Sequence, residues 1–92
     1  DFYSTFVMKQ FLAEIDVMPH DALLDPQGKA VLTGLARLDL SDVVDVRVGK
    51  HIRMQMQAAN AADAESMARK ACQELLANPV MESFSLNVRE LP

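Results

Sequence analysis

Apolar and polar side chains alternate along four short stretches of the chain, with the period of two that is typical of strands burying one face. These stretches are residues 10–18, 43–48, 51–57 and 83–89. The side chains expected to face inward are Phe11, Ala13, Ile15, Val17, Val44, Val46, Val48, Ile52, Met54, Met56, Phe84, Leu86 and Val88. We therefore predict four strands.

Two further stretches repeat their apolar residues with a helical period. Asp25 and Pro26 begin the first, because an aspartate can accept hydrogen bonds from free helix amides and proline at the first helical position loses none. Asn60 caps the second, which must end near Asn78 because Pro79 disfavours helical geometry just before it. The predicted apolar stripes are Val31, Gly34, Leu35 and Leu38 in the first helix, and Ala64, Met67, Ala68, Ala71, Cys72, Leu75 and Leu76 in the second.

Two glycines in the first helix are unusual. Glycine inside a helix costs about 1 kcal/mol relative to alanine, so Gly28 in the first turn predicts the close approach of another backbone and a contact surface. Gly34 lies on the apolar stripe, where a missing side chain would let the helix lie close to its sheet.

The element order is strand, helix, strand, strand, helix, strand. Gly49 and Lys50 suit a two-residue hairpin between the second and third strands. With right-handed crossovers, this order predicts an α+β fold of the ferredoxin-like βαββαβ type: a two-layer sandwich with a four-stranded antiparallel sheet in spatial order 4-1-3-2 and both helices on one face. The other face, which solvent or a partner must cover, would carry Glu14, Asp16, Asp45, Arg47, Arg53, Gln55, Ser85 and Asn87.

The length of 92 residues and a hydrophobic content of 50% predict one compact domain over residues 8–92. Asp1 to Val7 are expected to be an added leader or a frayed extension. A domain this small buries only about 60 to 65% of its unfolded surface, which leaves oligomerisation as a means of stabilisation. Cys72 is the single cysteine, so it can form no internal disulfide, and its place on the apolar stripe predicts a core residue.

The net charge of −4 and the isoelectric point near 4.9 argue against nucleic acid and anionic membranes as partners. The sequence has neither an apolar run of about 20 residues nor a signal-peptide pattern, so we expect a cytoplasmic protein.

Candidate chemistry is sparse. The two histidines, His20 and His51, have no nucleophile or further ligands at a recognisable spacing, so we predict neither a catalytic nor a metal site. Gly28 is a weak phosphate-loop signal because Asp25 would repel an anion. A basic cluster of Arg47, Lys50 and Arg53 suits either an acidic partner or phosphate, or a solvated strand face balanced by Asp42 and Asp45. The open sheet face lacks the aromatic residues that an RNA-binding sheet displays.

Residues 24–31 (LDPQGKAV), 46–50 (VRVGK) and 75–78 (LLAN) together resemble the PurS small-subunit family of phosphoribosylformylglycinamidine (FGAM) synthase. The resemblance implies de novo purine biosynthesis, in which FGAR becomes FGAM with ATP and glutamine-derived ammonia. It implies a non-catalytic subunit, a homodimer or higher oligomer, that joins a synthetase large subunit to a glutaminase subunit and supports ammonia channelling. No cofactor would bind this chain alone, and ATP, Mg and glutamine would be used by the partner subunits.

The resemblance also implies contact residues, each serving either the dimer or a partner subunit. They are Asp25, Gln27, Gly28, Lys29, Arg47, Gly49, Lys50 and Asn78. The loop from Met18 to Leu24 is longer than the family pattern, which leaves its contacts open. The alternative function is a ferredoxin-like regulatory module that binds a small ligand. Acylphosphatase-like hydrolysis is disfavoured because residues 18–21 (MPHD) contain no glycine to cradle an anion.

Overall fold

The computed structural model describes residues 7–92 and contains one antiparallel sheet of three strands. Strand β1 (Lys9–Pro19) lies in the centre, between β2 (Lys50–Ala58) and β3 (Glu82–Glu90). In the predicted order 4-1-3-2, the strands numbered 4, 1 and 3 correspond to β3, β1 and β2, and their order is confirmed. The predicted strand over residues 43–48, at the edge of the sheet, is missing from the described residues. The expectation for the leader, Asp1 to Val7, concerns residues that lie outside the described part except for Val7.

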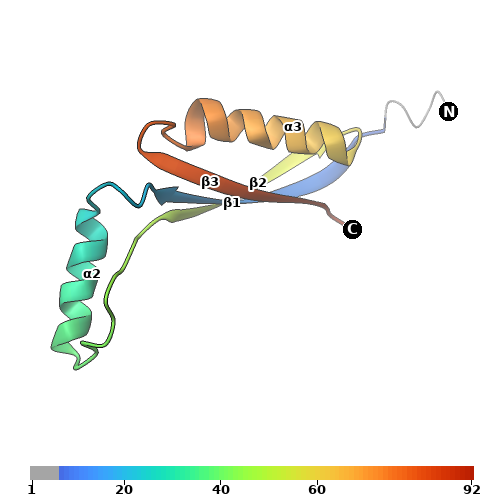
Figure 1. Cartoon of the computed structure of the whole chain (residues 1–92). Helices are drawn as coiled ribbons and strands as arrows, with labels where there is room; N and C mark the ends of the chain where they lie inside the picture. The colour runs from blue at the N-terminus through green and yellow to red at the C-terminus, as the bar shows by residue number, and fades with distance from the viewer. Residues whose placement is uncertain (1–6) are drawn as a thin grey trace.

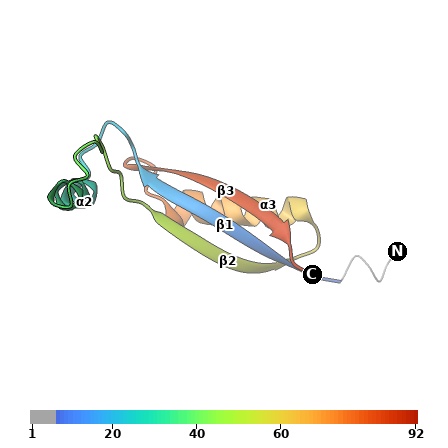
Figure 2. The same ribbon diagram turned by 90° about the horizontal axis from the view of Figure 1, so that it is seen from below.

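Helix α3 (Ala61–Ala71) covers one face of this sheet (Figures 1 and 2). Asn60 caps it as predicted, because the Asn60 side chain accepts a hydrogen bond of 2.8 Å from the Asp63 amide. The small residues Ala64 and Ala68 are fully buried and let the helix lie close to the strands. The core consists of Phe11, Ala13, Ile15, Val17, Met56, Ala58, Ala64, Ala68, Cys72 and Ala77, with Ile52, Met54, Leu76, Phe84, Leu86 and Val88 packed against it.

The end of this helix widens into η1 (Cys72–Leu76), a single turn of π-helix. Its wider turn is closed by a 3.0 Å hydrogen bond from the Ala77 amide to the Cys72 carbonyl. The extra residue in the turn displaces Leu75 from the predicted stripe, so that its side chain is 81% exposed while Ala77 is buried instead. Met67 is also exposed, which corrects its predicted place in the core.

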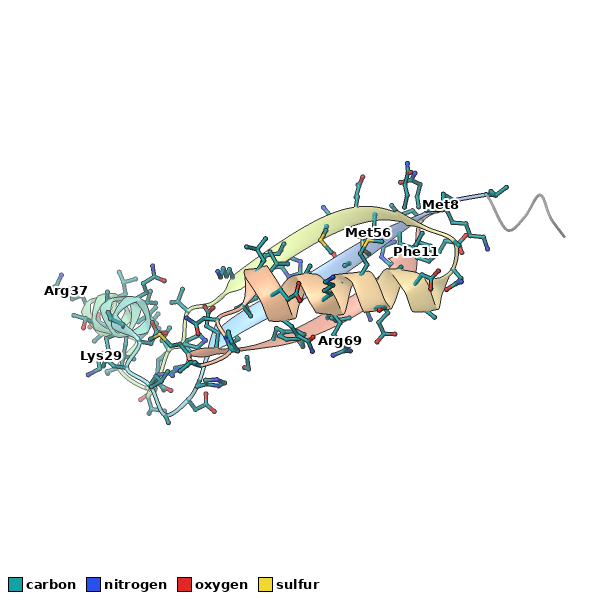
Figure 3. The ribbon with its side chains drawn as sticks, turned by 90° about the horizontal axis from the view of Figure 1, so that it is seen from above. Met8, Phe11, Lys29, Arg37, Met56 and Arg69 are labelled. Carbon is teal, nitrogen blue, oxygen red and sulfur yellow. The ribbon has the colours of Figure 1, made fainter. Side chains whose placement is uncertain are left out.

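Helix α2 (Pro26–Arg37) does not lie on the sheet, contrary to the prediction. With the extended residues 38–49 that follow it, α2 projects beyond the end of the sheet (Figure 1). We call residues 26–49 the arm. Figure 3 shows Lys29 and Arg37 on the arm at one end of the molecule, and Phe11 and Met56 beside α3 at the other. A side chain at Gly34 would meet nothing within 4 Å, so the expected close packing of this glycine on the sheet is wrong.

The predicted strand 43–48 and the hairpin at Gly49 and Lys50 are absent from the described chain. The favoured two-residue hairpin turns need a residue with positive φ, and no described glycine has one. Such a turn would also pair Val48 with His51, whose side chain lies on the polar face of the sheet. Val44, Val46 and Val48 would then point to that polar face instead of the core. The segment 43–49 instead runs on into β2 as extended chain, without a sheet neighbour.

The molecule is therefore elongated, with extents of 62 × 29 × 14 Å. Its radius of gyration is 18.2 Å, against about 12 Å for a compact chain of this length. The prediction of a compact shape is wrong because the arm lies off the core. The arm leaves large apolar side chains exposed, namely Val31, Leu38, Leu40, Val43 and Val44.

The sheet face opposite α3 is mostly polar, as predicted, although Leu12 on β1 lies buried on it between Gln55 and Arg89. Glu14 at its centre lies between Arg53 on β2 and Asn87 on β3. An Asp16 carboxylate oxygen lies 2.7 Å from Nδ1 of the exposed His51 ring and accepts a hydrogen bond from it in the tautomer that carries the proton on Nδ1. Asp45 and Arg47, which were expected on this face, lie in the arm. Among the described residues, no helix has the length and apolar character that a membrane crossing requires.

Candidate functional site

The residues singled out by the sequence converge where the arm meets the sheet. This region, which we call the junction, consists of residues 19–28, 46–49 and 78–82. It brings the end of β1, the start of α2, the segment leading into β2 and the turn before β3 together at one end of the sheet (Figure 1).

Asp25 is the centre of the junction. One carboxylate oxygen accepts a 3.1 Å hydrogen bond from the Gly28 amide, which caps α2 as predicted. The other accepts a 2.7 Å hydrogen bond from the Val48 amide. The Asp25 side chain is buried. The two amides hold the pKa of the Asp25 carboxyl below its ordinary value, and the Val48 amide has the larger effect. One ionised carboxylate therefore fixes the start of α2 to the segment that leads into β2.

Gly28 lies against the backbone of that same segment. A Cβ built on Gly28 would stand 2.1 Å from the Val46 carbonyl oxygen and 2.7 Å from the Asp25 carboxylate. The predicted close approach of another backbone is confirmed, and this backbone belongs to the same chain. Whether Gly28 also contacts a partner stays a prediction.

Arg47 braces the loop between β1 and α2. Its Nη2 donates hydrogen bonds to the carbonyls of His20 at 2.5 Å and Leu23 at 2.9 Å. Over residues 7–92, Arg47 Nε is the one buried side-chain polar atom without a hydrogen-bond partner. The basic cluster considered from the sequence does not form around Arg47, since Arg53 lies over the sheet, 3.7 Å from the Glu14 carboxylate.

Gly49 is needed for a second close approach. A Cβ there would lie 2.3 Å from both the Val17 carbonyl oxygen and the Met18 sulfur. The glycine that suggested a tight turn instead lets the extended chain pass beside the end of β1. Its neighbour Lys50 begins β2 opposite Val17 and is exposed.

Asn78 organises the turn that precedes β3. Its side-chain oxygen accepts hydrogen bonds from the Val80 amide at 2.9 Å and the Met81 amide at 3.3 Å. Its own amide donates a 2.8 Å hydrogen bond to the Glu82 carboxylate. Sequence reasoning missed Glu82, for which the chain offers no local signal, and it missed the backbone of Val48 as the second partner of Asp25.

Two hollows flank the junction. Gln27 and Asn78 line the first, of about 390 Å³, together with Leu24, Met81 and Glu82. Lys29 and Arg47 line the second, of about 380 Å³. Six of the predicted contact residues thus lie within the junction: Asp25, Gln27, Gly28, Arg47, Gly49 and Asn78. Lys29 lies outside the junction and borders the second hollow, whereas Lys50 borders neither hollow.

The side chains of the junction position backbone segments and form no arrangement typical of a catalytic site. Within the described residues, no three histidine, cysteine or acidic side chains gather as a metal site would require. Cys72 is fully buried in the core, and loss of solvation raises the pKa of its thiol, which suppresses the reactive thiolate. What this geometry can do is set the position of the arm.

Comparison with known proteins gives a consistent family. The family model of PurS, phosphoribosylformylglycinamidine (FGAM) synthase, matches residues 12–90. The phosphoribosylformylglycinamidine synthase subunit PurS of Thermotoga maritima is 37% identical over 84 residues, covering 91% of this chain and 100% of the relative.

Solved structures agree in shape as well as in sequence. Thermus thermophilus PurS superposes with a TM-score of 0.79 and 42% identity, covering 90% of this chain and 99% of that one. A chain in the structure of PurLQS from Thermotoga maritima superposes with a TM-score of 0.78 and 37% identity, covering 91% of this chain and 100% of that one.

Proposed function

We propose, from the premise that this chain belongs to the PurS family of FGAM synthase, that it is the subunit that joins a synthetase subunit to a glutaminase subunit. As a PurS subunit it functions in purine biosynthesis. A similar chain in the structure of PurLQS supports assembly with other subunits. We further propose that ATP, Mg and glutamine are used by those subunits, that ammonia passes between them, and that the complex is cytoplasmic.

One observation carries this proposal: the hydrogen bonds of Asp25 and Arg47 hold the arm away from the core, with its apolar side chains exposed. Val44 is 88% and Leu38 70% exposed, and burying such side chains favours association by about 1.5–3 kcal/mol each. In this position, these side chains lie away from their own sheet (Figure 1). A second copy of the chain would cover them.

The backbone of the arm supports pairing with that second copy. In extended chain, the amide and carbonyl groups of successive residues point to opposite edges. The Val46 carbonyl and the Val48 amide face α2, so the groups of Asp45 and Arg47 face the other edge. Within the described chain, the backbone amides and carbonyls of residues 44–47 form no hydrogen bonds with other backbone groups. The edge formed by Asp45 and Arg47 is therefore open to pairing with another strand.

A two-fold axis near Gly49 would pair the segment 43–48 of one copy with β2 of the other. Val44 would then lie opposite Met54, and Asp45 opposite Arg53 as an ion pair across the strands. Apolar residues would share one face, as the strand pattern requires. The partner's segment would supply the fourth strand beside β2, and its α2 the second helix, completing the ferredoxin-like sandwich in the order 4-1-3-2. Exchange of an identical element is an established route to dimers.

Reconstitution tests the function. The purified chain is mixed with the synthetase and glutaminase subunits of the same organism, and glutamine-dependent FGAM formation is measured with and without it. We expect complex formation and activity only with the chain present, and light scattering of the chain alone should give twice its mass or a multiple of that. Unchanged activity and an unchanged complex without the chain would contradict the bridging function.

A further inference from the structure

The turn at residues 78–82 displays apolar side chains on a rigid support. Besides the hydrogen bonds to the Asn78 side chain, the Asn78 carbonyl accepts hydrogen bonds from the amides of Met81 at 3.2 Å and Glu82 at 2.8 Å. The Met81 carbonyl in turn accepts a 2.9 Å hydrogen bond from the His20 amide, which ties the turn to the loop before α2. The backbone of this turn is therefore held in one conformation before any binding, which lowers the entropic cost of association.

Those side chains face solvent to an unusual degree. Val80 is 79% and Met81 53% exposed, and Leu24, on the neighbouring loop, is 68% exposed. Leu24 and Met81 both line the hollow of about 390 Å³, whose other wall includes Pro19 and Pro26. Clustered apolar residues around a hollow mark an interaction surface rather than ordinary scattered exposure.

This surface lies on the side of the segment 46–48 that faces α2. The second copy proposed above would pair along the other edge, where the backbone groups of Asp45 and Arg47 point. Strand pairing with the second copy thus uses the edge away from the hollow, so we assign the hollow to a subunit of a different kind.

We propose that Leu24, Val80 and Met81 form the docking surface for a partner subunit, which inserts an aliphatic or aromatic side chain into the hollow and places a basic residue against Glu82. Glu82 borders the hollow and has only one of its carboxylate oxygens engaged, by the Asn78 amide. The chain's net charge of −4 favours a basic partner surface. The inference rests on the proposed function, because the partner is a subunit of the same synthase.

Two matched substitutions separate this surface from the dimer. Val80→Glu and Val44→Glu introduce the same charge at valines of similar exposure, on the turn and on the arm respectively. We expect Val80→Glu to keep the wild-type mass in light scattering and to bind the synthetase and glutaminase subunits at least tenfold more weakly. We expect Val44→Glu to lose the dimer. Binding of Val80→Glu within twofold of wild type would overturn the proposal.

A second pair guards against an effect on folding. Met81→Glu should weaken complex formation, whereas Met67→Glu, at a similarly exposed methionine on α3, should not. Glu82→Gln keeps the acceptor for the Asn78 amide but removes the charge, so binding should weaken several-fold and lose part of its salt dependence. Equal binding by both methionine variants would refute the docking surface. Failure of the wild-type chain to join the complex would instead refute the proposed function.

Discussion

The exchange of glycine for alanine at two positions of α2 should have opposite effects. At Gly34 a Cβ meets no atom of its own chain within 4 Å, so within one copy Gly34→Ala should gain the difference in helix propensity, about 1 kcal/mol. At Gly28 the same Cβ would stand 2.1 Å from the Val46 carbonyl oxygen, well inside the 3.0 Å that Cβ contacts essentially never cross. One helix thus contains both the test and its control.

The cost at Gly28 can be worked from this contact. The obstructing atom belongs to the backbone and cannot rotate away, so the segment 46–48 must move off α2 and strain its hydrogen bond to Asp25. Overpacking of this kind costs up to about 3 kcal/mol, and the gain of about 1 kcal/mol in helix propensity leaves a net loss of about 2 kcal/mol.

Hydrogen exchange of the Val48 amide measures this loss where it occurs. The amide is protected by the Asp25 carboxylate, and a loss of about 2 kcal/mol corresponds to about 30-fold faster exchange, since about 1.4 kcal/mol is tenfold. Gly34→Ala should leave Val48 exchange unchanged or slower. If Gly28→Ala protects Val48 as well as Gly34→Ala does, the close approach at Gly28 is not a constraint.

Three further predictions concern the core and the carboxylate. The pKa of Asp25 is lowered in the folded chain, so its stabilisation is present above the ordinary value of 3.8 and is lost as pH falls through the folded value. The protection of the Val48 amide, relative to its intrinsic exchange rate at the same pH, should therefore fall as pH drops below 3.8, and Asp25→Asn should remove this dependence. Ile15→Ala, which empties a fully buried site in the central strand, should lower the free energy of unfolding by about 2–5 kcal/mol in urea denaturation; a loss below about 1 kcal/mol would contradict its place in the core. The Cys72 thiol should resist a thiol reagent in the native chain and react on unfolding, and prompt reaction under native conditions would show that the core opens there.

The sequence was sufficient to predict the strands and helix caps whose packing partners lie in the same chain. The alternation around Ile15 and Leu86 and the caps at Asp25 and Asn60 reflect local geometry and burial, and the structure confirms them. The prediction at Gly28 also succeeded, because a glycine in the first turn of a helix is costly unless another backbone lies against it. The buried face of the second helix was predicted up to Cys72 except at Met67, and the prediction failed beyond Cys72 because the apolar period gives no signal for a turn of π-helix.

The arm was mispredicted for a physical reason. Valines at 44, 46 and 48 follow a strand pattern, and the assumption that the chain folds back on itself at Gly49 places their partner in the same molecule. The pattern indicates a segment that pairs with a strand but does not indicate in which copy that strand lies, and in the proposed dimer it belongs to the second copy. The contact residues taken from the family resemblance were more informative about position than about role: Asp25, Gly28, Arg47 and Gly49 build the junction, and their contacts with partners stay predictions.

The central claim, that the arm of one copy completes the sheet of another, can be tested by a single measurement. In a mixture of copies with different isotope labels, an isotope-filtered NOE experiment detects contacts between the methyl groups of Val44 and Met54 that occur only across copies. The account predicts such contacts between differently labelled chains. The same contacts found only within one chain, in a monomer whose segment 43–48 folds back onto its own β2, would contradict it.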